Sequence, residues 1–248
     1  MKNIVEQFLI LIQFMTRIPI FYHIEYSEEK LGKGMKFFPL VGLLIGILLF
    51  WEGCFLSRII ENKMITTLLI IITEILITGA IHIDGLADTF DGLFSYTGKD
   101  RILEIMKDSR IGTNGAVVLI LYFLCKMVFL SEIINIDMKY LIIYPVISRL
   151  STSVNAAFGK YARDTGMSKG IIEMNTVKDG LFSIILVFII VTFIMKIKGI
   201  IALLTGLIFI FLFRKEVYRK IEGITGDTMG ASLELTSLII MMTGVILK

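Results

Sequence analysis

The sequence predicts an all-α bundle of helices that crosses a membrane several times and forms one domain over residues 1–248. Of these residues, 56% are hydrophobic and only 19% are charged, and the mean hydropathy of +0.83 is high for a soluble domain. Several apolar stretches approach the roughly 20 residues that a helix needs to cross the hydrocarbon core. Lys and Arg residues also gather in alternate loops, which is typical of polytopic membrane proteins.

The chain begins with a segment that is amphipathic rather than fully apolar. Residues 1–22 mix apolar side chains with Glu6, Gln13 and Arg17, and Pro19 ends the helical pattern. No small-residue cleavage site follows, so the segment does not resemble a secretory signal peptide. We therefore expect an N-terminal interfacial helix that lies along the membrane surface.

Seven apolar stretches are each expected to form a transmembrane helix, with short helices on the cytoplasmic side between some of them. They cover residues 37–56, 64–82, 115–135, 140–158, 181–195, 199–213 and 231–247. The fifth and sixth stretches are short, and only Lys196, Ile197 and Lys198 separate them.

The distribution of basic residues agrees with an odd number of spans. With a cytoplasmic N-terminus, seventeen Lys and Arg residues fall on the cytoplasmic side. Six fall on the other side: Arg58, Lys63, Lys139, Lys196, Lys198 and Lys248. The same topology places every motif-rich loop in the cytoplasm. We therefore expect a multi-pass protein of the cell membrane (the inner membrane) with a cytoplasmic active site.

Charge and cysteine content exclude other classes. The net charge of +3 is modest and the chain has no long basic run, so nucleic-acid binding is not expected. The basic loops instead suit anionic lipid headgroups. Cys54 and Cys125 lie in apolar stretches without a C-x-x-C partner, so we expect small core side chains rather than a zinc site or a disulfide.

The strongest candidate for a catalytic motif follows the second apolar stretch, in HIDGLADTFDG. Asp84, Asp88 and Asp91 have the spacing i, i+4, i+7 and would form one stripe of a helix. Carboxylates this close repel one another unless a cation neutralises them, and Mg²⁺ or Mn²⁺ suits an all-oxygen site. His82 would lie away from this stripe, and roles as a general base reached through a break at Gly85, as a positioning partner or as a helix cap stay open. The alternative is a solvated acidic helix face.

A second polar segment covers residues 101–112 and reads as a short amphipathic helix with Asp100 as N-cap and Gly112 as its stop signal. Its mixed charges suit a diphosphate substrate, because acids can bind a metal while Lys and Arg bind phosphate oxygens. These charged residues are Arg101, Glu104, Lys107, Asp108 and Arg110. The alternative is an interfacial helix whose charges pair with each other and with lipid headgroups.

A third polar segment covers residues 223–234, where a helix is expected to begin near Gly226. Asp227, Gly230 and Glu234 fall on one stripe, so two acids could share a metal while the N–H groups at the helix start accept a phosphate. A small-residue seam for helix packing is the alternative.

Single polar residues inside the apolar stretches should face the bundle interior, because they are costly against lipid. They are Glu74, Lys126, Ser148, Arg149 and Asn155. Arg149 is the candidate for contact with an anionic substrate group, whereas Lys126 could pair with Glu74 or Glu132. Loop residues Tyr161 and Arg163 lie on the side of the motifs and could reach over the site.

The three motifs HIDGLADTFDG, RILEIMKDSRIGTNG and GITGDTMGASLE resemble, in this order, those of the cobalamin synthase family, the adenosylcobinamide-GDP ribazoletransferases. The resemblance extends from Phe14 to Glu234, essentially the whole chain. The acid pattern is also similar to that of CDP-alcohol phosphotransferases. Asp88 stands where their motif has an arginine, so the implied kinship is distant.

The resemblance implies a phosphodiester-forming transfer in cobalamin biosynthesis. A hydroxyl of α-ribazole, or of its 5′-phosphate, attacks the phosphorus next to the cobinamide in adenosylcobinamide-GDP, and GMP leaves; Mg²⁺ is the expected cofactor. Other late-step corrinoid enzymes are conceivable partners. The preferred lower base, the number of metal ions, the general base and the oligomeric state stay open.

Spacing and resemblance together define the predicted site. The predicted metal ligands are Asp84, Asp88, Asp91, Asp227 and Glu234. The predicted catalytic residues are Asp84, Asp88, Asp91, His82 and Asp108. The predicted substrate-binding residues are Glu104, Lys107, Arg110, Arg149, Arg163, Gly226 and Gly230.

Two other functions are weighed against this one. A membrane prenyltransferase also uses Asp-rich diphosphate sites, but its second motif of D-x-x-x-D type is missing here. A cation-coupled transporter could use Glu74, Lys126 and Arg149 as a relay, but the two halves of the chain lack the paired broken helices of many transporters.

Overall fold

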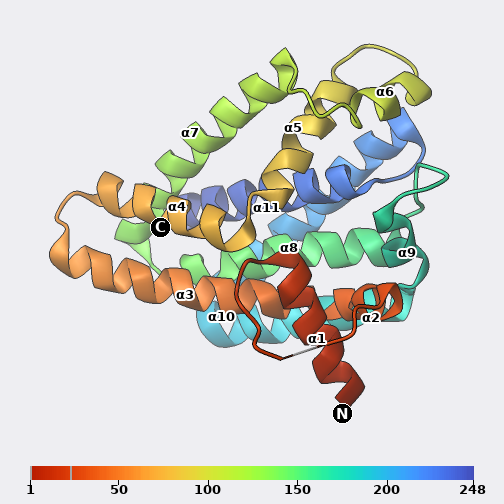
Figure 1. The fold of residues 1–248 in the computed structure, drawn as a ribbon. Helices are drawn as coiled ribbons and strands as arrows, with labels where there is room; N and C mark the ends of the chain where they lie inside the picture. Colours follow the sequence, from red (N-terminus) through yellow and green to blue (C-terminus); the bar gives the residue numbers. More distant parts are fainter. Residues whose placement is uncertain (1, 23) are drawn as a thin grey trace.

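The computed structural model describes residues 2–22 and 24–248, and regular secondary structure in them is helical apart from one isolated bridge between Tyr161 and Ile224. Figure 1 shows the helices as one bundle. Their bounds are α1 (Lys2–Met15), α2 (Glu28–Gly34), η1 (Met35–Phe37), α3 (Phe38–Ile59), α4 (Lys63–Thr78), α5 (Ile81–Leu93), α6 (Lys99–Ile105), α7 (Thr113–Ile136), α8 (Tyr140–Phe158), α9 (Met167–Glu173), α10 (Val177–Ile221) and α11 (Gly226–Ile246).

The central helix of the bundle is α8, which packs against α3, α10 and α11 and is buried along almost its whole length. Pro145 lies inside it and lacks the N–H that would bond to the carbonyl of Leu141. At this place α3 comes close, because a Cβ on Gly46 would lie 2.7 Å from the Cα of Ile142. Small residues on α3 therefore allow two backbones to meet at the centre of the bundle.

The expected membrane-spanning class is confirmed. Among the described residues, five helical segments are long and apolar enough to cross a membrane: residues 28–59, 113–136, 140–158, 177–221 and 226–246. A sixth is formed if the bent pair α4 and α5 is one span. Large apolar side chains such as Phe193 and Trp51 are exposed, which suits contact with lipid. The chain is therefore a multi-pass membrane protein, while the number of seven spans stays a prediction.

The predicted span 64–82 is wrong at its C-terminal end. Helix α4 ends at Thr78, and the chain bends by 91° before α5 begins. Gly79 and Ala80 make this bend with left-handed φ angles of 65° and 61°, and the Gly79 N–H bonds to the carbonyl of Ile75. Glycine is the usual residue for such a helix end. His82 therefore belongs to α5 together with the aspartates, and the helix has no break at Gly85.

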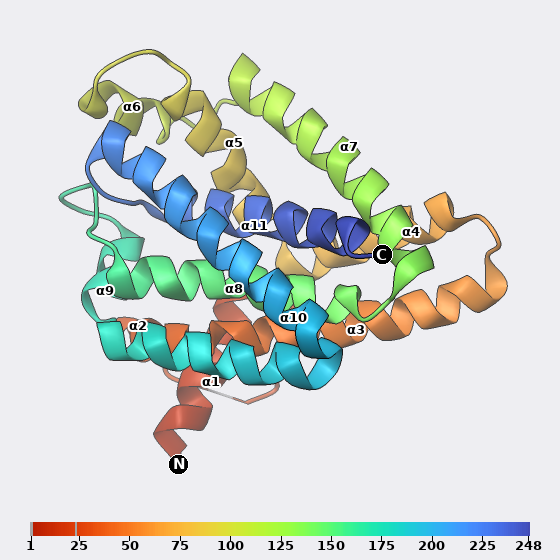
Figure 2. The same ribbon diagram turned by 180° about the vertical axis from the view of Figure 1, so that it is seen from behind.

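The predicted stretches 181–195 and 199–213 form two arms of α10. The arms meet at Lys196, whose backbone is not helical (φ 50°, ψ −128°). Figure 2 shows that the chain reverses at this point, so the arms form a V. Gly199 is needed there, because a Cβ would collide with the Val191 carbonyl of the other arm.

The N-terminal segment forms a helix as expected, although it is shorter than the predicted 22 residues. Helix α1 ends at Met15, and the Thr16 N–H donates to the Ile12 carbonyl before the chain becomes irregular ahead of Pro19. It packs against α2 and α3. An interfacial position for α1 stays a prediction.

Cysteines introduced at Lys160 and at Asp137 are expected to react with a membrane-impermeant thiol reagent from opposite faces of the membrane. These positions flank α8, whose 19 residues span about 28 Å. The test uses a chain in which Cys54 and Cys125 are replaced by Ala. A cysteine at Glu61 is the control, and it should be modified from the same face as the one at Asp137. Reaction of the Lys160 and Asp137 positions from one face would contradict this topology.

Candidate active site

The predicted motifs meet where α5 and α11 cross with their backbones almost in contact. A Cβ on Gly85 would lie 2.9 Å from the carbonyl oxygen of Asp227, and a Cβ on Gly230 would lie 3.1 Å from that of His82. Small residues at a crossing let two helices approach this closely. Gly230 therefore has a packing role besides its predicted place at the substrate site. The crossing brings the start of α11 beside the aspartates of α5.

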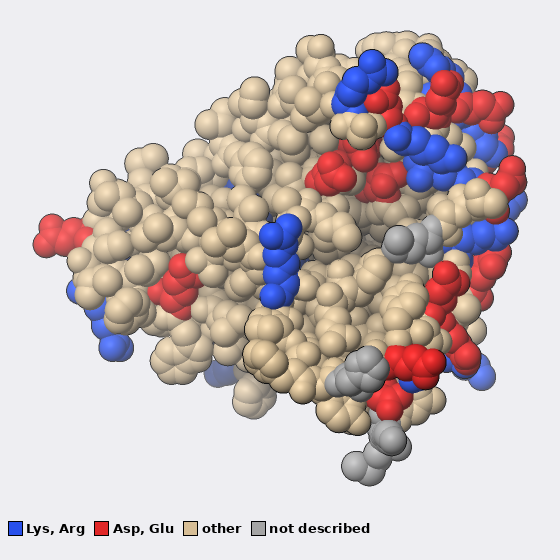
Figure 3. All heavy atoms as spheres, in the orientation of Figure 1, with Lys and Arg blue, Asp and Glu red and all other residues tan. Residues whose placement is uncertain are grey.

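Three carboxylates gather at this crossing. The Asp88 side chain is repelled by those of Asp84, Asp227 and Asp91 and attracted by Arg163. Asp84 is exposed, whereas Asp88 and Asp227 are half-buried. Figure 3 shows acidic side chains in a hollow of the surface, next to Lys and Arg side chains. This cluster of Asp84, Asp88 and Asp227, which we call the acidic cluster, contains two of the three aspartates of the predicted stripe and one acid of the third motif.

Asp227 is held by residues from outside α5. Its Oδ2 atom accepts hydrogen bonds from Arg163 Nη2 at 3.0 Å and from Thr225 Oγ1 at 3.3 Å. Thr225 is also the N-cap of α11, because its hydroxyl accepts from the N–H of Thr228. The helix begins at Gly226, as the sequence predicts.

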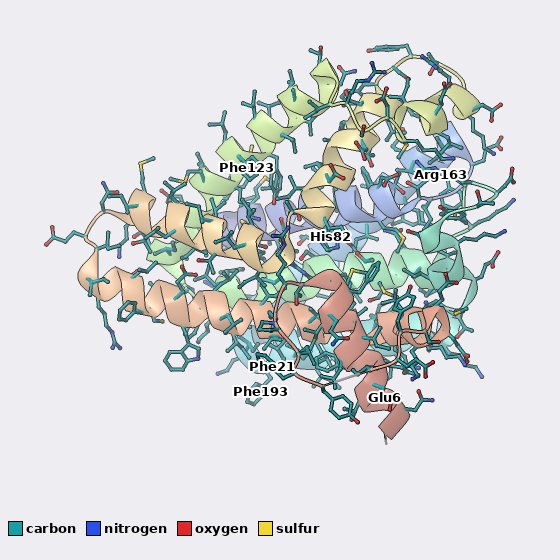
Figure 4. All side chains as sticks on the ribbon, in the orientation of Figure 1. Glu6, Phe21, His82, Phe123, Arg163 and Phe193 are labelled. Atoms are coloured by element: carbon teal, nitrogen blue, oxygen red, sulfur yellow. The ribbon has the colours of Figure 1, made fainter. Side chains whose placement is uncertain are left out.

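Arg163 is positioned by a paired loop. The Ala162 N–H bonds to the Ile224 carbonyl at 2.9 Å, and the Ile224 N–H bonds to the Lys160 carbonyl at 2.8 Å. These two bonds tie residues 160–162 to the turn before α11. Figure 4 shows Arg163 on this side of α5, away from His82. A loop that looked irregular in the sequence therefore delivers a guanidinium to the acidic cluster.

Asp91 points to a different partner. Its two carboxylate oxygens accept the backbone N–H groups of Gly112 and Gly115, each at 2.8 Å. A carboxylate that binds the first N–H groups of a helix caps it and is stabilised by its dipole. Asp91 thus fixes the start of α7 against α5, and its predicted role as a metal ligand stays a prediction.

Glu234 does not join the acidic cluster, so the predicted sharing of one metal ion with Asp227 finds no support in this arrangement. It lies two turns beyond Asp227, which is about 10 Å along the helix axis, and it is buried in the bundle. There it accepts a short hydrogen bond from Tyr122, and Lys126 Nζ is 3.9 Å from its carboxylate. Asp227 and Glu234 lie on one helix, as the i, i+7 spacing predicts, but the Glu234 side chain is buried in the core.

Arg149 is also placed differently from its prediction. Its Nη1 atom is 3.8 Å from Glu74 Oε1 and donates to Ser148, and its side chain is 1% exposed. It does not line the small cavity that opens beside Asp84 and has His82 and Thr152 in its wall. A buried charge needs a counter-charge, and Glu74 supplies it. The predicted contact of Arg149 with substrate is therefore not found.

Lys126 completes this buried set of charges. Its Nζ atom is 2.8 Å from Glu74 Oε2 and donates to the Tyr122 hydroxyl at 2.8 Å. The expected pairing with Glu74 is confirmed, whereas Glu132 lies near Lys248 instead. We call Glu74, Lys126, Arg149 and Glu234 the buried quartet. Two carboxylates and two cations balance its formal charge, and its members come from α4, α7, α8 and α11.

A cavity of about 190 Å³ opens beside Asp84 and Asp227. Its polar wall includes His82, Thr152 and Ser168, and its apolar wall is formed by Phe14, Met15, Met35, Ile81, Ile171 and Met229. The sequence analysis missed Thr152 and Ser168, although Ser148 and Thr152 already form an i, i+4 polar pair inside an apolar stretch.

His82 lies on the wall of this cavity rather than among the carboxylates. Its ring centroid is 5.9 Å from that of Phe38. Its Nδ1 atom and the Oγ1 atom of Thr152 are buried and have no hydrogen-bond partner among the described residues. Unsatisfied buried groups cost free energy, so a ligand or water that reached them would be stabilised.

A second hollow of about 350 Å³ separates α6 from the loop that carries Arg163. The predicted substrate-binding residues Glu104, Lys107 and Arg163 all line it, together with Lys99. Lys99 and Lys107 both line this hollow. The structure thus brings three of the predicted residues together beside the acidic cluster. Asp100 and Asp164 line the same hollow, so three basic and three acidic residues face it, and we call it the charged cleft.

The remaining charged residues of the second motif lie elsewhere. Helix α6 ends at Ile105 instead of continuing to Gly112, which is the N-cap of α7. Asp108 accepts hydrogen bonds from the side chain and the backbone N–H of Arg110, and these bonds lower the pKa of its carboxyl to about 2. Asp side chains that bond to nearby backbone favour turns over helix. Asp108 and Arg110 pair with each other in a separate hollow beside Asp91.

The acidic cluster suits a cation by its chemistry. Among the described residues, no three His, Cys, Asp or Glu side chains lie close enough to enclose an ion by themselves. Mg²⁺ does not need such a cage, because it usually keeps several waters and binds one or two carboxylates plus phosphates of the substrate. Asp84, Asp88 and Asp227 offer hard oxygen ligands and mutual repulsion that a divalent ion would relieve.

Replacing Gly85 with Val is expected to lower activity about ten- to a hundredfold. The added side chain would meet the Asp227 backbone, which cannot move aside as a flexible side chain can, and displacements of about 1 Å at a reacting site cost this much. Gly98→Val is the matched control, because a Cβ at Gly98 has nothing within 4 Å. The measurement is the initial rate of product formation. Equal rates for both variants would contradict the role of this crossing.

Comparison with known proteins agrees with the motifs. The family model described as cobalamin-5-phosphate synthase matches residues 7–245. A Fusobacterium nucleatum protein named adenosylcobinamide-GDP ribazoletransferase is 43% identical over 94% of each chain. Relatives of the same name from Clostridium acetobutylicum and Clostridioides difficile are 39% and 36% identical, over 95% or more of each chain. No solved structure gives a significant match.

Proposed function

The chain belongs to the cobalamin-5-phosphate synthase family, and we propose that it joins adenosylcobinamide-GDP to α-ribazole, or to its 5′-phosphate, in the final step of cobalamin synthesis. The observation that carries the site assignment is the acidic cluster at a helix crossing, between a small apolar-walled cavity and the charged cleft. The family assignment argues against a prenyltransferase or a transporter.

In the proposed reaction, a hydroxyl oxygen of α-ribazole attacks the phosphorus next to the cobinamide. A new P–O bond forms, and the bond from this phosphorus to the bridging oxygen of the diphosphate breaks. GMP carries away that electron pair, and the hydroxyl loses its proton. The reaction therefore needs neutralised phosphate oxygens, an oriented hydroxyl and a proton acceptor.

The charged cleft is the proposed site for the diphosphate of the donor. Its basic side chains are Lys99 of α6, Lys107 just after α6 and Arg163 of the loop before α9. Arg163 lies between this cleft and the acidic cluster, since it also binds Asp227. Its planar guanidinium can bind two phosphate oxygens at once. In this proposal, the phosphates of the donor compete with the Asp227 carboxylate for the Arg163 guanidinium.

The cavity beside Asp84 is suited to the acceptor. Its volume of about 190 Å³ is below the roughly 300 Å³ of pockets for drug-sized ligands, so it excludes a corrin ring or a whole GDP. Apolar walls with a few polar groups suit the benzimidazole ring of α-ribazole. Asp84 is exposed and lines this cavity, which makes it the carboxylate placed to accept the proton of the hydroxyl.

Mg²⁺ is the proposed cofactor, with Asp84, Asp88 and Asp227 as its candidate ligands. When bound, it would neutralise phosphate oxygens and stabilise the leaving phosphate. The chain itself contributes the alignment of these carboxylates through the glycine crossing and the hydrogen bonds to Asp227. One or two of the three carboxylates are enough for this ion.

The proposed function is tested with purified protein, adenosylcobinamide-GDP, α-ribazole and Mg²⁺. GMP should appear in equal amount to the phosphodiester product, stop appearing when a chelator is added, and return when Mg²⁺ is restored. A second reaction with α-ribazole 5′-phosphate decides between the two acceptors by their kcat/KM. GMP release without any acceptor would indicate a hydrolase, and release in full with the chelator present would contradict the metal assignment.

A further inference from the structure

A groove of about 540 Å³ lies between α8 and the second arm of α10. This arm lies on the side seen in Figure 2, whereas α5 lies on the side seen in Figure 1. The groove walls are apolar and are formed by Val154 and Phe158 of α8 and by Leu207, Ile210 and Phe211 of α10. The groove is therefore separate from the acidic cluster.

The outer surface of this arm has the character of a lipid-facing helix. Leu204, Ile208 and Phe211 are 54%, 60% and 67% exposed. Exposed apolar side chains in such a row are stable only where lipid or protein covers them. The groove thus opens from the membrane rather than from water along most of its length.

One end of the groove carries cations and aromatic rings. Arg214, Lys215 and Tyr218 line it. The backbone N–H of Lys160 donates to the Tyr218 hydroxyl, so the chain at residue 160 reaches this same end. Within the described ranges, neither Lys160, Arg214 nor Lys215 has a carboxylate within 4 Å. The nearby acids are already paired, since Glu216 binds Arg219 at 2.6 Å.

The Arg214 side chain is held in place before any ligand binds. It donates to the carbonyl of Phe158 at the end of α8, and its guanidinium stacks over the Tyr218 ring at 5.2 Å. A side chain held in this way loses little freedom on binding. Because α8 ends at Phe158, these cations lie at the end of the bundle where the charged loops begin, which is the level of lipid headgroups.

We propose that this groove binds an anionic phospholipid, with one acyl chain along the apolar walls and the headgroup phosphate beside Lys160, Arg214 and Lys215. Basic pockets between transmembrane helices are typical sites for anionic headgroups. A soluble anion would gain nothing from the apolar walls, and a zwitterionic lipid would place a cation near the basic end. The combination of both surfaces selects an anionic lipid.

The test uses the purified full-length chain in a neutral detergent. Phosphatidylglycerol should raise the thermal unfolding temperature in a saturable way and be retained as one lipid in native mass spectrometry. Phosphatidylcholine with the same chains should need at least about tenfold higher concentration. Each removed cation should weaken binding about fivefold, so K160Q/K215Q should weaken it more than tenfold.

Two further variants separate the site from general lipid contact. K63Q/K139Q removes two Lys residues at the opposite end and should bind phosphatidylglycerol like the unchanged chain. L207W, at a half-buried position of the groove wall, fills the groove without changing charge and should lose the retained lipid, which tests the proposal even if K160Q/K215Q folds poorly. Equal retention of both lipids, an equal effect of the two charge variants, or a full stabilising effect of glycerol phosphate alone would overturn the proposal.

Discussion

Replacement of Asp84 or Asp88 with Asn is expected to lower the rate of GMP release at least about a thousandfold. Asn keeps the shape of the side chain but cannot accept a proton or offer a charged oxygen to Mg²⁺. The loss should appear in kcat, because neither residue lines the charged cleft proposed for the donor. The measurement is single-turnover GMP release at saturating Mg²⁺.

The same substitutions should leave the protein folded, which separates a catalytic loss from a structural one. Asp88 is repelled by its acidic neighbours, so removing one charge relieves repulsion rather than breaking an ion pair. We expect an unchanged or higher thermal unfolding temperature for both variants. Glu61→Gln is the control, because Glu61 is exposed at the opposite end of the bundle. Turnover at the normal rate with Asp84 and Asp88 both replaced would contradict the acidic cluster as the reacting centre.

Local patterns in the sequence predicted much of the fold. The span 140–158 coincides with α8, and the aspartate stripe lies on a helix, because both depend on hydropathy and spacing within one segment. The bend between α4 and α5 was not predicted. Gly79 is a common helix end, but Ala80 in the left-handed region is rare for a residue with a Cβ, and only contacts from the rest of the bundle can hold it there.

The site could be predicted only as far as its residues act within one helix. Arg163 and Asp227 are 64 residues apart in the sequence, and a pairing between two loops brings them together. No periodicity reveals such a contact. For Arg149, the sequence correctly indicated that a polar side chain inside an apolar stretch faces the interior, whereas Glu234 was expected at the metal site with Asp227. The sequence did not indicate which charge each would meet, because a buried ion pair and a substrate site place the same demand on a single helix.

Lys126→Met is expected to destabilise the protein by about 3–5 kcal/mol, since it leaves an uncompensated charge in the buried quartet. Lys126 is 2% exposed and lies between Glu74 and Glu234 at 2.8 and 3.9 Å. Without it, two buried carboxylates share Arg149 alone. The measurement is the free energy of unfolding in detergent, and Lys139→Met at an exposed position is the control.

The quartet's charge balance also predicts a partial rescue. Glu74→Gln added to Lys126→Met removes one charge of each sign, so the double variant should be less destabilised than the sum of the two single variants by about 1–3 kcal/mol. The rescued protein should also regain GMP release, because the quartet joins α4, α7, α8 and α11 rather than touching substrate. Additive losses would mean that Lys126 and Glu74 act independently, and an inactive but fully stable double variant would place one of them in the reaction.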